Sequence, residues 1–437
     1  MAPLGVIRIL TDDQRGWDDG DGNNLRDAMP NFLAWFETHG VFYPNYRIIS
    51  PVCAPSRATE FSSRYAEQHF CRINEETLNY KPWYSTQRVL WNAEMYNLLM
   101  SKYLWTSNGD PWNPLLTWNS WRRPSYWHWR GKAGPTRDEA EHDVALVEEG
   151  IRPYLDGDIP GPFFLHFGTN IPHSGYSAEP VDPYTPIDWV LPPSAFETEE
   201  QLLLKSPSNR GHVNDETRET GLADLAGMEQ ECVALDQQFN ALLNIFTPEQ
   251  RDNILWLWST DNGYEVGEHG NTRKQYPYEG STRGFLYAAW PDGGVGEDVV
   301  DERLVANLDI NPTILTALEV NEAYEEYQMG FDVLDAGNSR DWLYHSMPGG
   351  GSGATRVDPW DMAVFADVDG NPVSKYIRTP QADGTNWIEN YDLEADPWEM
   401  EADNAVDTDI EDQMDEFKAG LTRDLYPFTE KNTNVCQ

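Results

Sequence analysis

The stretch Val6-Ile7-Arg8-Ile9-Leu10-Thr11-Asp12-Asp13 indicates the fold class of this chain of 437 residues. Its first five residues are apolar except for Arg8, which predicts a short strand buried on both faces and ending at the acidic pair. Similar apolar runs occupy residues 163–167 and 254–258. Strands of this kind alternating with helices predict an α/β fold, a large mixed sheet sandwiched between helices. Helical spacing of apolar residues predicts those helices over residues 27–39, 138–155 and 222–246.

A glycine-rich stretch at residues 349–353 indicates either a domain boundary or a long surface loop. Beyond it, residues 362–366 and 374–378 predict two strands joined by a turn at Asn371, and residues 409–421 predict a helix. We therefore expect a main domain over residues 1–345 and a smaller C-terminal α+β subdomain, with a short antiparallel sheet, over residues 346–437.

The charge of the chain is strongly acidic. Asp plus Glu number 73 against 31 Lys plus Arg, which gives a net charge of −42, and only 8 of the cations are Lys. Nucleic acid is a poor partner for such a surface, because phosphate binding needs a basic footprint. No run approaches the roughly 18 apolar residues of a membrane span. The scarcity of Lys favours adaptation to salty surroundings over an acidic surface that serves solubility alone.

Oxygen-bearing side chains follow two of the three predicted strands. Asp12 and Asp13 follow the first, Asp261 and Asn262 follow the third, and the second leads toward His173. Ligands of α/β sheets gather at the carboxyl ends of strands, and hard cations such as Ca²⁺ take about six to eight oxygen ligands. The pattern predicts a metal site. Capping of a helix or turn by each Asp is the alternative.

Cys53 lies in the sequence Cys53-Ala54-Pro55-Ser56-Arg57, before a helix predicted over residues 56–65. The positive end of a helix dipole favours an anion beside this residue. Cys53 is therefore either a nucleophile with a depressed pKa or a buried, inert thiol.

Six motifs, in the same order along the chain, resemble those of the formylglycine-dependent sulfatases of the alkaline-phosphatase superfamily. Residues 53–57 resemble the C-x-P-S-R signature of that family. The other five matches are Ile9–Gln14 (first strand and metal-binding loop), Pro162–Leu165 with Pro172-His173 ("PFFL…PH"), Ser259–Gly263 with Gly267–Gly270 ("SDNG…GEHG"), Lys274 with Tyr278–Gly280 and Arg283 ("K-x-x-x-Y-E-G-G-x-R"), and Asn390–Pro397 ("LYDLENDP").

The resemblance implies a sulfatase, a hydrolase of sulfuric esters, in which a maturation enzyme converts Cys53 into the aldehyde formylglycine. One hydroxyl of the hydrated aldehyde attacks sulfur, and deprotonation of the other ejects sulfate; a thiol lacks this second hydroxyl. By the same resemblance, the catalytic residues are Cys53, Arg57, His173 and Lys274. One Ca²⁺ is expected on Asp12, Asp13, Asp261 and Asn262, and the residues expected to bind substrate are His269, Arg283 and His128.

One family motif, "GKWHLG", is missing about fifty residues after the Cys, where Ser107–Trp112 carry Asp and Trp instead. Lys102, His128 or Lys132 are candidates to substitute for it in space. The departure keeps open a sulfatase-like glycan-binding protein with impaired turnover. A phosphoester or phosphonate hydrolase of the same superfamily is the other alternative.

A tryptophan-rich segment, residues 105–129, carries Arg122 and Arg123, with Arg130 adjacent. Aromatic faces and guanidinium groups predict contact with a sulfated carbohydrate; an insertion that packs its own aromatics is the alternative. We expect a sulfated small molecule or glycan as substrate and a formylglycine-generating enzyme as partner. The resemblance suggests a periplasmic or secreted protein, although no signal-peptide pattern precedes residues 6–10.

Overall fold

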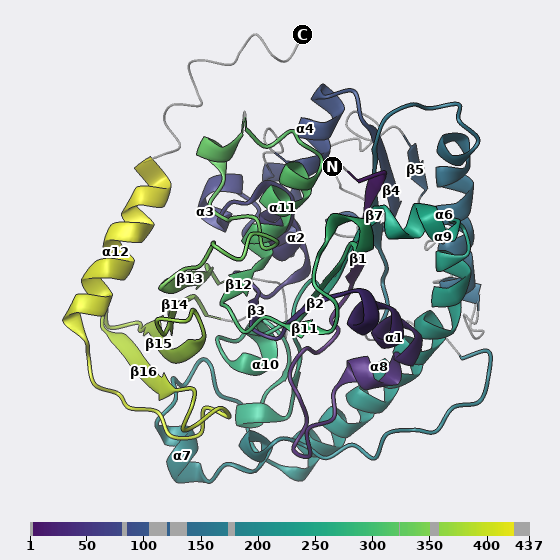
Figure 1. Ribbon diagram of the computed structural model, residues 1–437. Helices are drawn as coiled ribbons and strands as arrows, with labels where there is room; N and C mark the ends of the chain where they lie inside the picture. Colours follow the sequence, from purple (N-terminus) through teal and green to yellow (C-terminus); the bar gives the residue numbers. More distant parts are fainter. Residues whose placement is uncertain are drawn as a thin grey trace.

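The computed structural model describes residues 3–80, 85–104, 120–122, 138–173, 180–322, 324–349 and 358–423 (Figure 1). Across these residues, eight strands form one large sheet in the order β11-β2-β10-β7-β1-β6-β4-β5. In that order the strands are Val299–Val300, Gly40–Tyr43, Leu286–Ala289, Ile254–Thr260, Gly5–Thr11, Phe163–Gly168, Tyr96–Ser101 and Ser120–Arg122.

The three strands predicted from apolar runs lie together at the centre of this sheet. β1 runs parallel to both β6 and β7, with Ile7 opposite Leu165 on one side and Trp256 on the other. β10 is antiparallel to β7 and to β2, so the sheet is mixed, as predicted. Parallel pairing brings the carboxyl ends of β1, β6 and β7 to one edge of the sheet, which is where the polar motifs follow.

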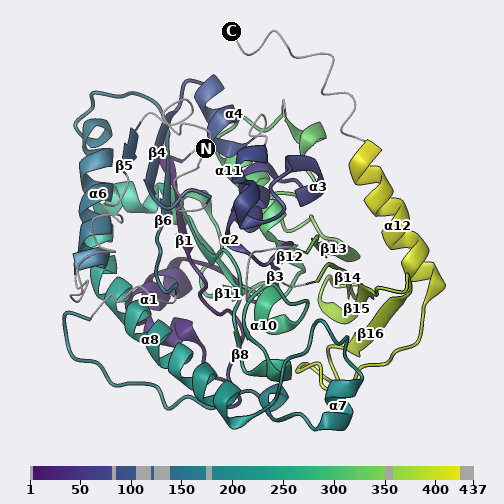
Figure 2. The same cartoon turned by 180° about the vertical axis from the view of Figure 1, so that it is seen from behind.

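Helices cover both faces of the sheet, as Figure 2 shows from behind. One face is covered by α1 (Pro30–His39), α6 (Asp138–Leu155) and α8 (Asp215–Leu243), the other by α2 (Cys53–Ser62), α4 (Thr86–Asn92) and α11 (Ile310–Ala317). The shorter helices are α3 (Ala66–His69), α7 (Glu199–Leu203), α9 (Pro248–Asp252) and α10 (Glu279–Thr282), and the short strand pairs are β3 (Tyr46–Arg47) with β12 (Val305–Ala306) and β8 (Glu265–Val266) with β9 (Thr272–Arg273). None of the described helices is both long and apolar enough to cross a membrane.

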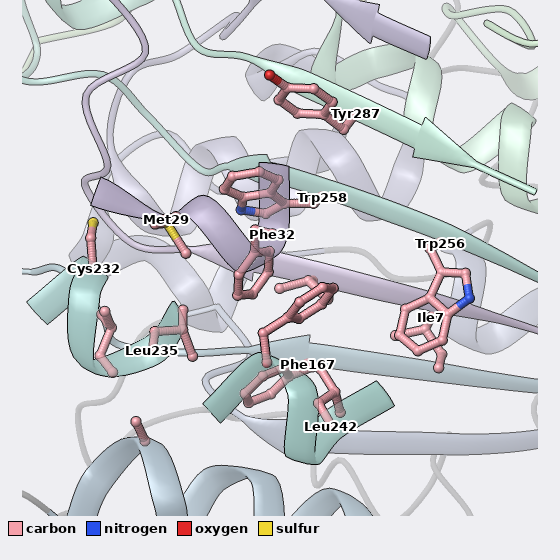
Figure 3. Packing of buried hydrophobic residues seen from close by; sticks show 14 of the residues in the cluster. Ile7, Met29, Phe32, Phe167, Cys232, Leu235, Leu242, Trp256, Trp258 and Tyr287 are labelled. Carbon is pink, nitrogen blue, oxygen red and sulfur yellow. The ribbon is translucent and has the colours of Figure 1, made fainter. Parts of the chain in front are cut away.

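Aromatic side chains fill the core between the sheet and α1 and α8 (Figure 3). Phe32 of α1 packs against Phe239 of α8 with ring centroids 3.9 Å apart and against Trp258 of β7 at 4.7 Å. Full burial of one such side chain contributes about 1.5–3 kcal/mol to folding. This packing fixes β7, and with it the loop that follows β7, relative to the helices.

Arg8, which interrupts the first apolar run, is fully buried within β1. Its guanidinium donates two hydrogen bonds to the Glu60 carboxylate of α2, at 2.9 and 2.7 Å. A buried charge is tolerated when it is paired and hydrogen-bonded in this way. The pair also ties α2 to the central strand.

Helix bounds differ from the predicted ones where polar residues begin a helix. α8 begins at Asp215, seven residues before the predicted start, and the Asn214 side chain caps it by accepting the Thr217 amide at 2.9 Å. α1 begins at Pro30, after a 3-10 turn over Leu25–Ala28. The first turns of α8 carry few apolar residues, so hydrophobic spacing could not find them.

The C-terminal part forms a small antiparallel sheet, as predicted. Within the described residues it has four strands in the order β13 (Trp342–Met347), β14 (Trp360–Ala366), β15 (Pro372–Pro380) and β16 (Asn386–Asp392). α12 (Thr408–Arg423) packs on it through Met414 and Leu421. β13 spans the predicted boundary at residue 345, and the division into 1–345 and 346–437 stays a prediction.

Candidate active site

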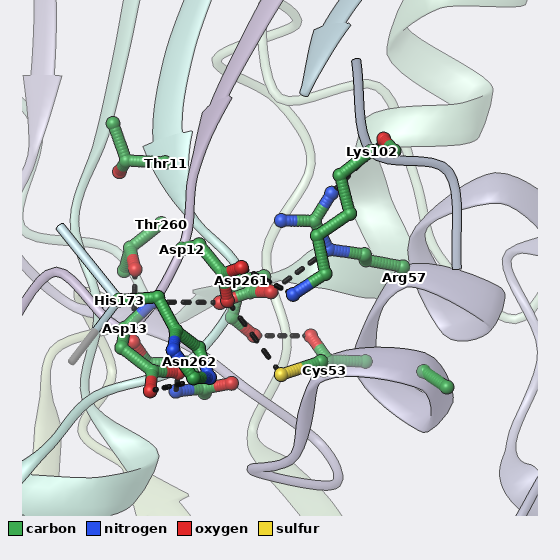
Figure 4. Close-up of polar contacts among 12 residues, drawn as sticks. Thr11, Asp12, Asp13, Cys53, Arg57, Lys102, His173, Thr260, Asp261 and Asn262 are labelled. Carbon is green, nitrogen blue, oxygen red and sulfur yellow. Dashed lines mark hydrogen bonds and ion pairs between the residues drawn. The ribbon is translucent and has the colours of Figure 1, made fainter. Parts of the chain in front are cut away.

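The two acidic motifs meet at the carboxyl ends of β1 and β7. Thr11 lies opposite Thr260, so the loops that follow them emerge side by side. The Asp13 amide donates to Asp261 Oδ1 at 3.1 Å, and Asn262 Nδ2 donates to Asp13 Oδ1 at 2.8 Å. Asp13 adopts a left-handed backbone with φ of 64°, which turns its carboxylate toward the second loop (Figure 4). The structure therefore brings together all four predicted metal ligands.

Cys53 is the first residue of α2, three residues earlier than the predicted helix start. Its Sγ lies 3.6 Å from Asp12 Oδ1 and 2.9 Å from Lys274 Nζ. The Ser56 hydroxyl donates to the Asp261 carbonyl, and the Ala54 amide donates to Asn74 Oδ1 at 2.9 Å. These bonds fix the N-terminal turn of α2 against the loop after β7 and against the 3-10 helix Asn74–Asn79, with Cys53 facing the carboxylates.

Cys53 is not a thiolate in this environment. Burial raises the pKa of its thiol to about 12, and the favourable charges of Lys102 and Lys274 do not offset that effect. Burial therefore favours the inert thiol over a nucleophilic thiol with a depressed pKa, because desolvation outweighs the neighbouring cations. The unmodified side chain is an unreactive thiol placed in a polar site.

Three cations, the buried Arg57 and Lys102 and the partly buried Lys274, pair with the three carboxylates of the site. Lys102 pairs with Asp12, Lys274 pairs with Asp13, and Arg57 Nε donates to Asp261 Oδ2 at 2.8 Å. Burial alone would raise the pKa of Asp12, but Lys102, His173 and Arg57 lower it to about 2. For Asp13, burial is likewise outweighed, mainly by Lys274, and its pKa falls below the ordinary value. Both carboxylates are ionised at neutral pH. In each of the three pairs, the cation neutralises the charge of its carboxylate.

His173 extends from the loop after β6 toward the same site. Its Nε2 lies 3.6 Å from Asp13 Oδ2, and its side chain is 29% exposed while that of Asp13 is 2% exposed. The imidazole therefore lies at the solvent-facing edge of the cluster, where an incoming molecule would meet it.

These residues fit a metal ion. Ligand atoms of Asp12, Asp13, Cys53 and His173 all lie within 4.8 Å of one another. Most of the donors of the site are carboxylate or amide oxygens, which hard divalent cations prefer. Asp261 and Asn262 adjoin this group through their hydrogen bonds to Asp13. The identity of the ion and the full set of ligands stay predictions.

Two of the predicted substrate-binding residues lie in networks of their own. His269 is buried, its Nδ1 lies 3.0 Å from Glu197 Oε2, and its ring packs on Tyr278 with centroids 4.1 Å apart. Arg283 donates to the Pro44 carbonyl at 3.0 Å, and its guanidinium lies over the Trp17 ring at 4.1 Å. The contacts described for these two residues do not join them to the cluster around Cys53, and their substrate-binding role stays a prediction.

Lys102 is the site residue that motif matching did not assign. It follows β4 directly, and its amide donates to the Gly168 carbonyl at the end of β6 at 2.6 Å, so parallel pairing carries it to the active edge. Of the candidates to substitute for the missing Lys/His motif, His128 and Lys132 lie outside the described residues, as do residues 107–112 and nearly all of the tryptophan-rich segment.

A family model for sulfatases matches residues 5–320, which include every residue of the cluster described above. The chain belongs to the sulfatase family. Among curated proteins, this sulfatase-family chain is 24% identical over 350 residues to a putative extracellular sulfatase Sulf-1 homolog of Caenorhabditis elegans. The match covers 71% of the chain but only 46% of that relative, so the chain spans about half its length.

Solved structures share the fold across the whole chain. A protein solved in complex with its substrate D-glucosamine-2-N,6-O-disulfate has a TM-score of 0.69 at 17% identity, covering 99% of this chain and all of that one. The phosphonate monoester hydrolase of Agrobacterium radiobacter has a TM-score of 0.63 at 17% identity, covering 97% of this chain and 96% of that one. At such identities the likeness concerns the fold alone.

Proposed function

We propose that this chain hydrolyses sulfuric esters, with Cys53 as the precursor of a formylglycine and with one Ca²⁺ in the acidic cluster. The observation that carries the proposal is the environment of Cys53. Its Sγ lies between Lys274 Nζ at 2.9 Å and Asp12 Oδ1 at 3.6 Å, yet burial keeps the thiol protonated. A protonated thiol at this position would not act as a nucleophile. An oxygen in place of that sulfur would lie within reach of the Lys274 ammonium and the Asp12 carboxylate.

The charges of the site suit an anionic substrate once a divalent cation is bound. Lys102, Lys274 and Arg57 neutralise Asp12, Asp13 and Asp261 pair by pair. A divalent cation added to this balanced set leaves a local excess of two positive charges, in a buried site where charges are weakly screened. A sulfate ester carries one negative charge, so it would be attracted despite the net charge of −42 on the whole chain.

The residues of the site would then have the following roles. Lys274 would hold positive charge at the attacking oxygen, and Arg57 and Lys102 would keep Asp261 and Asp12 ionised and oriented. His173, at the exposed edge, would give a proton to the leaving alcohol oxygen. The bound Ca²⁺ would supply Lewis-acid polarisation of the sulfate group.

The proposed substrate class is a sulfated carbohydrate. A structural neighbour was solved with its substrate D-glucosamine-2-N,6-O-disulfate, and 71% of this chain matches a putative extracellular sulfatase Sulf-1 homolog. The tryptophan-rich segment, with Arg122 and Arg123, is proposed to contact the sugar. A formylglycine-generating enzyme is the proposed maturation partner.

The test is a panel of aryl sulfate, aryl phosphate and aryl phosphonate esters, assayed with saturating Ca²⁺ on protein matured to formylglycine. We expect kcat/KM to be highest for the sulfate, and Cys53→Ala to lose that activity. Preference for the phosphonate would favour the second candidate function, which the likeness to a phosphonate monoester hydrolase motivates. Ca²⁺-dependent binding of sulfated glycans without sulfate release would instead indicate a glycan-binding protein with impaired turnover. Between turnover and impaired turnover, the buried position of Lys102 beside Asp12 favours turnover.

A further inference from the structure

Lys274 lies between two residues with an uncommon backbone conformation. Arg273 has a φ of 79° and Gln275 a φ of 84°, both in the left-handed region that residues with a Cβ rarely adopt. Such a backbone conformation is strained and persists only where the surrounding structure holds it. Something must therefore hold the chain around Lys274.

The C-terminal part of the chain, the small sheet and Glu399 beyond it, forms hydrogen bonds with residues 275, 277, 278 and 279. The Trp360 indole of β14 donates to the Gln275 carbonyl at 2.8 Å, and Lys375 Nζ of β15 donates to the Pro277 carbonyl at 3.3 Å. The other two contacts are Tyr278 OH to Glu389 Oε2 at 3.0 Å and the Glu279 amide to Glu399 Oε2 at 2.7 Å. This series of bonds begins at the residue directly after Lys274.

A buried ion cluster strengthens this attachment. Lys375 Nζ lies 2.6 Å from Glu279 Oε1 and 2.6 Å from Glu399 Oε1, and all three side chains are at most 3% exposed. Arg47 of β3 reaches the same Glu279 carboxylate at 2.5 Å. Polar networks that are buried and fully paired rigidify the segments they join. Residues 275–279 are therefore fixed both by the C-terminal sheet and by β3 beside the main sheet.

We propose that Trp360, Lys375 and Glu399 are positioning residues of the active site. By holding residues 275–279, they keep the strained turn in place and direct the Lys274 ammonium to Cys53 and Asp13. The proposal rests on the proposed function, because it assigns these residues to the same site. It gives the C-terminal subdomain a part in the reaction, although its sheet contributes no side chain to the cluster around Cys53 that the structure describes.

The test is a double-mutant cycle on the matured, full-length protein. Trp360→Phe keeps an aromatic ring but removes the N–H donor to Gln275 together with part of the buried ring. We expect it to lower kcat/KM for an aryl sulfate by about 2- to 10-fold, chiefly through kcat. In a Lys274→Ala background the same substitution should change kcat/KM by less than about twofold, because its effect passes through Lys274. Trp342→Phe is the matched control, since Trp342 of β13 packs on Phe365 within the same sheet, and it should leave activity unchanged.

An equal loss from Trp360→Phe in both backgrounds would overturn the proposal, because a general structural effect is additive. If Trp360→Phe does not fold, Glu399→Gln gives the same cycle, since it keeps the size of the side chain while weakening its bonds to Lys375 and to the Glu279 amide. Amide hydrogen exchange separates this proposal from the proposed function. Faster exchange over residues 272–280 in Trp360→Phe, with exchange in β1 and β7 unchanged, supports the positioning role even if no ester is hydrolysed. Unchanged exchange over 272–280 contradicts it.

Discussion

Replacement of Lys102 by Met tests the charge balance of the site most sharply. Lys102 is 3% exposed in its side chain and pairs with Asp12, which is fully buried. Removal of one partner of a buried pair leaves an uncompensated charge and costs about 3–5 kcal/mol of unfolding free energy. The loss of one preorganised charge from the site should also lower kcat by about 100- to 1000-fold.

The matched control is the same substitution at an exposed lysine, Lys418, whose buried partner Asp361 keeps a second cation, Arg378. Lys418 is 43% exposed, and its Nζ lies 2.9 Å from Asp361. Lys418→Met should cost about 1 kcal/mol or less and leave kcat within a factor of two of wild type. Unfolding in urea with and without Ca²⁺ gives the free energies, and hydrolysis of an aryl sulfate gives the rates. Because a bound cation takes over part of the charge balance, the destabilisation of Lys102→Met should shrink in saturating Ca²⁺. Equal behaviour of the two variants would refute the role assigned to Lys102.

Four further predictions follow from the same site and its surroundings. Cys53→Ser should form a sulfate ester that it cannot release, so mass spectrometry should find one trapped sulfate and no steady turnover; continued turnover would place the nucleophile elsewhere. Exhaustive dialysis against a chelator should abolish activity, as should Asp261→Ala, and Ca²⁺ should restore only the wild type; full activity without metal would exclude the ion. Burial lowers the pKa of His69 to about 3, from about 6.5 when unfolded, so the unfolded chain binds one more proton between these values and stability falls as the pH is lowered. His69→Gln should remove up to about 1.4 kcal/mol per pH unit of that slope in urea unfolding, and an unchanged slope would contradict the assignment. Finally, kcat/KM for a multiply sulfated oligosaccharide should first rise with salt, because the Debye length falls from about 30 Å at 0.01 M to about 8 Å at 0.15 M and screens the acidic surface; a monotonic fall would mean that a basic patch dominates capture.

The central strands and most of the site were predictable because the chain encodes them locally. Continuous apolar runs are typical of strands buried on both faces, and β1, β6 and β7 occupy the predicted residues within two positions at either end. Asp12, Asp13, Asp261 and Asn262 follow such strands directly, so parallel pairing alone brings them together. The first and last strands of the small sheet, β13 and β16, were not predicted, since their residues mix charged, polar and aromatic side chains.

Lys102 was one of three candidates to substitute for the missing motif, and the sequence could not choose among them. Counting residues from Cys53 selected positions 107–112, whereas the lysine of the site lies several residues earlier, where β4 ends beside β6. Its position in the site depends on which strands pair, and a motif search carries no information about strand pairing. The contacts of Trp360 and Lys375 with residues 275–279 join residues 85 and 98 positions apart and follow no local pattern.

The most direct test of the central claim is the mass of the tryptic peptide that spans residues 48–57, measured on the same preparation whose sulfate release is assayed. The account predicts a peptide in which Cys53 has lost its sulfur and gained an oxygen, with activity proportional to the modified fraction. A preparation that releases sulfate catalytically while this peptide carries only unmodified cysteine would contradict it.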